Sequence, residues 1–176
     1  MSSRKTSKEK VACVDACFIE GDFIKAARSY KEAKSKRNKN YGVEIKISQR
    51  LRDILSTDTS LFITPVAKYE IFEGLIFSEN LRFDEAKQVY LNILERSKNL
   101  IEMKRIDKDL LSDDRIFQSL SKLKNKLSLC DVLNVEIARN AGMPIITSER
   151  KAYIWKLLYE KAYSQEDAWT LFRKKI

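Results

Sequence analysis

LSLCDVLNVEIARNAGMPIITSERK, at residues 127–151, is the stretch that decides the fold. Ser128 and Asp131 have the S-x-x-D spacing of a capping box, so an amphipathic helix is expected to begin near Ser128. Gly142 ends this helix, because glycine favours the backbone conformation that follows a helix, and Pro144 prevents it from resuming. The stretch therefore predicts a helix followed by a tight turn.

A short buried strand is expected next, at residues 143–147. Ser148 is placed to cap a second helix, which carries Glu149 in its first turn. In an open α/β sheet, the ligand crevice lies at the carboxyl ends of the strands, beside the helix starts that follow them. Asp131 and Glu149 are therefore expected to point toward one place.

Strands and helices alternate along the rest of the chain. Apolar runs predict strands at 11–14, 61–64 and 100–106. Apolar residues at helical spacing predict helices over 18–33, 43–55, 83–94, 116–127 and 168–172, and another that begins at Pro65. This alternation predicts an α/β fold with a mostly parallel sheet of about four to five short strands, flanked by helices.

Length and composition fit one domain. The chain has 176 residues and no linker rich in proline, glycine or serine, so one domain is expected at 11–176, after a flexible basic N-terminus at 1–10. No apolar run is long enough for a membrane span, so no membrane partner is expected. The three cysteines, Cys13, Cys17 and Cys130, lack CxxC spacing and are expected to be reduced core residues of a cytoplasmic protein.

The chain contains no histidine. Catalytic Ser-His-Asp and Cys-His pairs and histidine zinc sites are therefore excluded. Acid–base chemistry falls to carboxylates, lysine, tyrosine or a bound metal ion.

A formal net charge of +9 favours an anionic partner, with nucleic acid ahead of a membrane surface. Basic residues gather after the first predicted helix, where they could form either a phosphate-binding edge or an ordinary solvated helix end. They are Lys31, Lys34, Lys36, Arg37 and Lys39.

Four acids lie near predicted strand–helix junctions: Asp15, Glu70, Asp131 and Glu149. Taken singly, most have an ordinary explanation as helix caps or partners of the helix dipole. Taken together, they predict a carboxylate cluster at the carboxyl edge of one sheet. Such a cluster needs a cation, and carboxylate oxygens match Mg²⁺ or Mn²⁺.

The motifs that carry these acids resemble those of the PIN domain (PilT N-terminus) nucleases, which include the toxins of VapBC toxin–antitoxin pairs. VACVDACFIEGD is similar to the first acidic motif of the family, and TPVAKYEIFEGL to the second. The stretch at 127–151 is similar to the third and fourth motifs, and it is the most specific match. The four motifs occur in family order from Val11 to about Lys151, so the resemblance covers most of the chain.

The resemblance implies a PIN-like α/β/α sandwich and a metal-dependent endoribonuclease that hydrolyses RNA. Asp15, Asp131 and Glu149 would hold Mg²⁺ or Mn²⁺, and Glu70 would orient a water molecule. RNA would contact Arg150 and Lys151 besides the basic segment, and the supporting residues Thr147 and Ser148 would bind phosphate or metal-bound water. The partners implied besides RNA are a small antitoxin protein and a second copy of the chain.

Three departures from the family pattern keep other functions open. Ala16 stands where the family commonly has a hydroxyl residue, and Glu149 where it often has aspartate. Residues 27–59 also form a longer and more basic segment than a compact toxin would have. A non-catalytic PIN-like module that binds RNA or protein is the alternative, and a purely helical scaffold is the third hypothesis.

Overall fold

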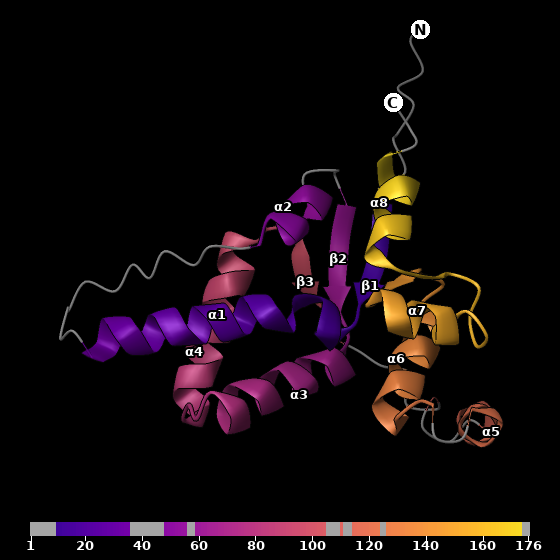
Figure 1. Cartoon of the computed structure of the whole chain (residues 1–176), viewed down its shortest axis with the longest axis horizontal. Helices are drawn as coiled ribbons and strands as arrows, with labels where there is room; N and C mark the ends of the chain where they lie inside the picture. The colour runs from indigo at the N-terminus through magenta and orange to yellow at the C-terminus, as the bar shows by residue number, and fades with distance from the viewer. Residues whose placement is uncertain are drawn as a thin grey trace, which may run out of the picture.

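A five-stranded parallel sheet forms the centre of the fold, with the strand order β3-β2-β1-β4-β5 (Figure 1). The computed structural model describes residues 10–35, 48–55, 59–104, 110, 114–123 and 126–173. The strands are β1 (Lys10–Val14), β2 (Thr59–Ile63), β3 (Leu100–Glu102), β4 (Ile145–Ile146) and β5 (Ala162–Tyr163).

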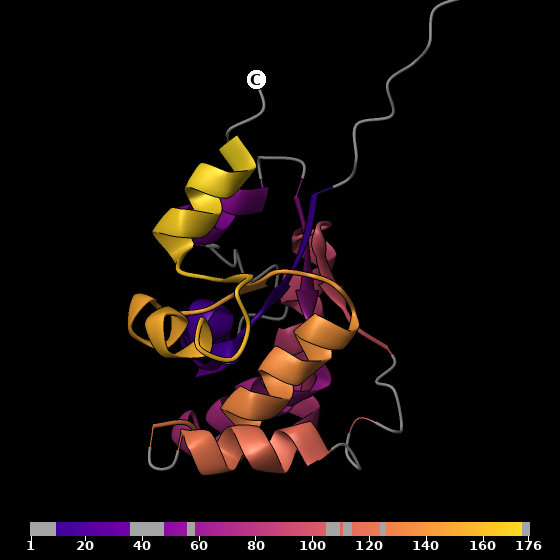
Figure 2. The same cartoon turned by 90° about the vertical axis from the view of Figure 1, so that its right-hand side faces the viewer.

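Helices connect the strands. Those before β3 are α1 (Ala16–Ser35), α2 (Gln49–Leu55), α3 (Pro65–Glu73), the π-helix η1 (Gly74–Ser78) and α4 (Phe83–Arg96). Those after β3 are α5 (Asp114–Lys122), α6 (Leu129–Asn140), α7 (Glu149–Trp155) and α8 (Gln165–Arg173). Figure 1 shows α1 running alongside α3, and Figure 2 shows α5 packed across α6.

Both faces of the sheet are covered, as is usual for a parallel sheet. Ala12 and Val14 of β1 pack with α1, α3, α4 and α8 on one face. Cys13, which points the other way, packs with Val135 of α6 and Trp155 of α7. The result is an α/β sandwich, as the alternating apolar pattern predicts, and the helical-scaffold hypothesis is wrong.

The direction of the connections reverses at β1. The chain passes from β1 to β2 on one side, whereas β4 lies on the other side. Val14 is in register with Ile63 and with Ile146, so these three strands end at the same edge. Such a reversal is where open α/β sheets bind ligands.

The stretch that decides the fold behaves largely as predicted. Ser128 caps α6 in a capping box with Asp131, and Gly142 follows with a φ of 67°. The strand is shorter than expected, only β4. Ser148 occupies the N-cap position of α7, but its hydroxyl makes no capping hydrogen bond, which corrects the expected capping role.

Other expectations need correction. The helix predicted over 116–127 ends at Lys122. Strand β5 was not predicted, because the sequence there has no clear apolar run. The strand predicted over 100–106 is only β3, at the edge of the sheet. Of the three free cysteines only Cys13 is a core residue, because Cys17 is exposed and Cys130 is half-buried.

Some expectations fall on residues that the structure does not describe. They include most of the N-terminal segment at 1–10 and residues 43–47, where the second helix was expected to begin. Within the described ranges, no helix is long and apolar enough to cross a membrane.

Alanine substitutions at two glycines test the backbone conformations described above. Gly142 has a positive φ, so Gly142→Ala should lower the free energy of unfolding by about 1 kcal/mol, although a Cβ there meets no atom within 4 Å. Gly21 lies within helix α1 with equally open space, so Gly21→Ala should raise it by about 0.5–1 kcal/mol. Urea unfolding followed by circular dichroism measures both, and shifts in the same direction would contradict this account.

Candidate functional site

Asp15 lies at the centre of a polar cluster where β1, β2 and β4 end. The residue is only 1% exposed, and its side chain accepts hydrogen bonds from several elements. Thr147 Oγ1 donates a 2.8 Å hydrogen bond to Asp15 Oδ2, and Asn134 Nδ2 donates one of 3.3 Å to Oδ1. The Cys17 thiol also donates to Oδ2, at 2.6 Å. A buried carboxylate needs such partners because desolvation disfavours its charge.

Asp131 uses its two oxygens for different purposes. Oδ2 accepts hydrogen bonds of 2.8 Å from the backbone N–H and from the hydroxyl of Ser128, which completes the cap of α6. Oδ1 lies 2.8 Å from Lys151 Nζ and accepts no hydrogen bond of good geometry within the described part of the chain. Burial alone would raise the pKa of Asp131, but Lys151 and Ser128 lower it below its usual value.

Lys151 reaches the cluster from the first turn of α7. Its ammonium lies 2.8 Å from Asp131 and 3.6 Å from Asp15 Oδ2, and it sits 5.8 Å from the centre of the Trp155 ring. Burial alone would lower the pKa of Lys151, yet the two carboxylates raise it above the ordinary lysine value. Lys151 is therefore a firmly charged cation shared by both acids.

Glu70 faces the same cluster from α3. Asn134 Nδ2 lies 3.5 Å from Glu70 Oε2, and the hydroxyl of Thr64 donates to Asn134 Oδ1. Desolvation first, and then the charge of Asp15, raise the pKa of Glu70 from 4.5 to about 7. A carboxyl group with such a pKa can take up or release a proton at neutral pH.

Glu20 is a further acid near the cluster, one turn along α1 from Asp15. Burial, followed by the charge of Asp15, raises the pKa of Glu20. Its carboxylate occupies the space beside Gly74, where a Cβ would lie 2.5 Å from Glu20 Oε1. Gly74 therefore makes room for this acid.

The two cysteines beside the cluster do not suit nucleophilic catalysis. Although Cys17 as a residue is exposed, its thiol is turned toward Asp15 and Thr147, so desolvation and the charge of Asp15 raise its pKa; burial and the charge of Glu70 raise that of Cys130. Both thiols are therefore held in the protonated form, which is the less reactive one.

The donors fit a cation but do not form a finished metal centre. Asp15 and Asp131 already share the charge of Lys151, and Asp131 Oδ1 has a free acceptor position. Within the described residues, no three Asp, Glu, Cys or His side chains are grouped as a ready metal site. The side chain of Glu149, the third expected ligand, lies outside the described part.

The structure gathers Asp15, Glu70, Asp131, Lys151 and Thr147 in one place. Of the other predicted site residues, two are next to Thr147 and Lys151 in the chain, two lie on α1, and the rest are described in part or not at all. Ser148 is half-buried, Arg150 is exposed, and Lys36, Arg37 and Lys39 are not described.

Lys31 and Lys34 lie near the far end of α1. Lys31 pairs with Glu79 at 2.7 Å, and Lys34 pairs with Glu85. Lys31 follows Asp15 by sixteen residues, which is roughly 24 Å along a helix axis. These two lysines are therefore distant from the acid cluster.

Sequence reasoning missed Asn134, Thr64, Glu20 and Cys17. Asn134 carried a signal, because it is a polar residue in the apolar run of α6, one turn after Asp131. Glu20 and Thr64 reach the cluster through helix packing and strand register, which local spacing does not reveal.

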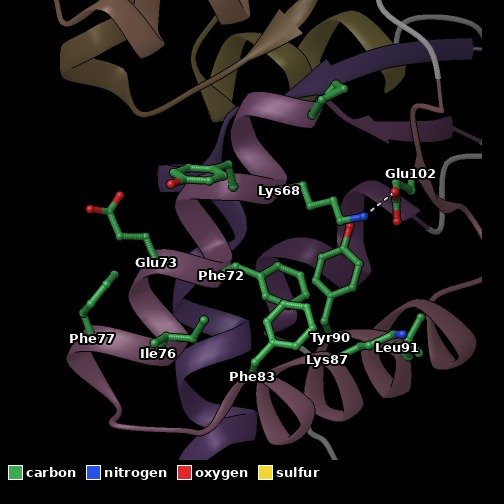
Figure 3. Close-up of a pocket in the computed structure, with 12 residues that line it drawn as sticks. Lys68, Phe72, Glu73, Ile76, Phe77, Phe83, Lys87, Tyr90, Leu91 and Glu102 are labelled. Carbon is green, nitrogen blue, oxygen red and sulfur yellow. Dashed lines mark hydrogen bonds and ion pairs between the residues drawn. The ribbon is translucent and has the colours of Figure 1, made fainter.

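An apolar groove lies between α3, η1 and α4 (Figure 3). Its volume is about 640 Å³, and Phe72, Phe83 and Tyr90 form a contiguous aromatic floor. Phe77, on η1, is 79% exposed at one side. Exposed aromatic residues gathered in this way usually mark a binding surface.

Glu70 makes stability depend on pH. Ionising it costs more in the folded state than in the unfolded state, so the wild-type protein loses stability as the pH rises from 4.5 toward 8. Glu70→Gln removes this cost and should raise the free energy of unfolding at pH 8 by about 1–2 kcal/mol, allowing for solvent screening. At pH 5 the gain should be much smaller.

Urea unfolding in EDTA at the two pH values measures the difference. The exposed Glu95→Gln is the control and should change stability by less than about 0.5 kcal/mol at either pH. A gain for Glu70→Gln that is equal at pH 5 and pH 8 would contradict the argument.

No protein-family model matches the chain, and a search of curated proteins finds no match to it. Its function must therefore be inferred from the acid cluster and from the motifs that carry the acids.

Proposed function

We propose that the chain is a metal-dependent endoribonuclease with a PIN-like active site. The observation that carries the proposal is that Asp15, Glu70 and Asp131, from three separate elements, meet at the edge where the connections of the sheet reverse. The ammonium of Lys151 contacts Asp15 and Asp131. The side-chain amide of Asn134 contacts Asp15 and Glu70. Each acid also stands in the motif that resembles the matching motif of that family.

The charges of the cluster support a bound cation. Asp15, Asp131, Glu70 and Glu20 lie near one another, and the cation of Lys151 contacts the two aspartates. Burial first, and then the charge of Asp15, raise the pKa values of Glu70 and Glu20, so negative charge of the neighbouring acids adds to the cost of desolvation. Mg²⁺ or Mn²⁺ would relieve this repulsion, because both prefer oxygen ligands.

Asp15 and Asp131 would hold the metal ion, and Glu149 is the candidate for a third ligand. When bound, the ion would activate water and neutralise charge on the phosphate that is attacked. Ser128 and Thr147 keep the two aspartates in place through the oxygens that they contact. Together with the bond from Asn134 to Asp15 Oδ1, these contacts hold both carboxylates and leave Asp131 Oδ1 facing Lys151.

Glu70 would act as the general base. Its pKa of about 7 lets it accept a proton from the attacking water at neutral pH. Asn134 links Glu70 to Asp15 and would keep the base beside the reacting water. A cation held by Asp15 and Asp131 would lower the pKa of Glu70 from this value, so the expected pH–rate profile rises below pH 7, as Glu70 loses its proton.

The substrate would be RNA, a preference that rests on the motif resemblance. The net charge of +9 favours a polyanion, and the exposed Arg150 directly precedes Lys151 in the chain. Phosphate contacts of this kind weaken as salt concentration rises.

The test of activity uses purified protein, Mn²⁺ or Mg²⁺, and a structured RNA labelled at one end. Asp15→Asn and Asp131→Asn should each lower the cleavage rate by at least about 100-fold, because each removes a charge that holds the ion. Glu95→Gln is the matched control at the far end of α4 and should cleave at the wild-type rate. Gel electrophoresis of the products measures the rates.

Two results would contradict this function. One is equal cleavage by the wild-type protein and both aspartate variants, and the other is cleavage that EDTA does not stop.

The groove favours a second candidate, a PIN-like module that binds a protein. We propose a second copy of the chain as its occupant. Figure 3 shows Glu73 and Lys87 at opposite sides of the groove, whereas Lys68 and Glu102 pair with each other at 2.6 Å. A two-fold axis would bring each Glu73 toward the partner's Lys87 and would cover the exposed aromatic side chains. This candidate does not exclude the first.

Phe77→Lys tests the groove. It should raise the dimer dissociation constant by at least about tenfold, because it puts a charge in an apolar contact. Tyr153→Lys is the matched control, since Tyr153 is 77% exposed on α7, outside the groove. Analytical ultracentrifugation measures both. If the wild-type protein is still monomeric at about 100 μM, its dimer dissociation constant lies above that concentration, and the dimer is excluded.

A further inference from the structure

We infer that Lys151 is an internal cation that competes with the divalent ion for Asp15 and Asp131, and that a phosphate group of the substrate releases it. The inference rests on the proposed function, because it describes how that same site is regulated. It assigns Lys151 a role beyond phosphate binding, that of gating the metal site.

The geometry makes the two cations exclusive. Lys151 Nζ is 2.8 Å from Asp131 Oδ1 and 3.6 Å from Asp15 Oδ2, so it lies between the two carboxylates. A divalent ion held by these two carboxylates would need the place that the ammonium occupies. It would then lie within a few ångströms of the ammonium, and the two positive charges would repel each other strongly. The ammonium must move before the ion can bind.

Lys151 has room to leave. Its side chain is 34% exposed, so the ammonium can turn toward solvent. Asp131 keeps its position after the departure, since Ser128 holds the other oxygen with two hydrogen bonds. Asp15 likewise stays bound to Thr147 and Asn134. The ligands therefore remain aligned while the competing charge departs.

A phosphate group is the natural destination for the released ammonium. The RNA backbone brings a negative charge to the cluster, and Lys151 can turn from the carboxylates toward it. Because coupling between two ligands is reciprocal, RNA should tighten metal binding and the metal should tighten RNA binding. The free protein would then bind metal weakly, which limits hydrolysis to the complex with substrate.

The experiment measures Mn²⁺ binding, by the electron paramagnetic resonance signal of the free ion, at pH 7 and without activity as a readout. Lys151→Gln should bind Mn²⁺ at least tenfold more tightly than the wild-type protein. Lys156→Gln is the matched control, because it removes the same charge from the end of the same helix, where Lys156 pairs with Asp167. Its affinity should stay within twofold of the wild type.

A second arm adds an RNA oligonucleotide with 2′-O-methyl groups. It should tighten Mn²⁺ binding to the wild-type protein at least fivefold, and to Lys151→Gln less than twofold. A third arm needs no variant: Mn²⁺ should speed acetylation of the Lys151 amine relative to Lys156, as read by mass spectrometry. This arm decides the question even if Lys151→Gln does not fold.

The outcomes separate the two proposals. Equal Mn²⁺ affinity of Lys151→Gln and the wild-type protein, or weaker binding by the variant, overturns the gating role and leaves the nuclease standing. Slower acetylation of Lys151 in Mn²⁺ also overturns it. Failure of every protein to bind Mn²⁺ at millimolar concentrations overturns the metal-dependent nuclease together with the gate.

Discussion

The burial of the Asp15 carboxylate is the constraint on which the rest of the site depends. A charge that is almost fully removed from water must be met by donors and by an opposite charge. Here they come from Thr147 after β4, from Asn134 on α6 and from Lys151 on α7. One carboxylate therefore links elements that are about 120 to 135 residues apart in the chain, and it does so at the edge where the direction of the connections reverses.

Much of this arrangement could be predicted from the sequence. Asp15 and Asp131 could be identified as acids at strand–helix junctions, because the spacing of apolar residues and the capping residues locate strand ends and helix starts. For Asp131, the sequence presented a helix cap and a functional acid as competing explanations. In the structure Oδ2 completes the cap, while Oδ1 faces Lys151 and the other acids of the cluster.

The remaining features depend on packing between distant elements. Glu20 approaches the cluster only because α1 packs against η1 at Gly74. The sequence predicted Lys151 as a phosphate contact, whereas its ammonium lies between two aspartates, a position that its spacing from Glu149 does not reveal. Short strands are also hard to predict: β5 has two residues, and its place in the sheet comes from pairing with β4.

The π-helix η1 has a consequence for how this surface could change over time. A π-helix is equivalent to an α-helix that has gained one residue. Losing that residue would restore α-helical geometry and rotate the chain beyond it by about 100°. Phe77 would then leave its side of the groove, whereas Glu70 lies before the change and would keep its place. A single-codon deletion could thus alter the groove while it leaves the acid cluster intact.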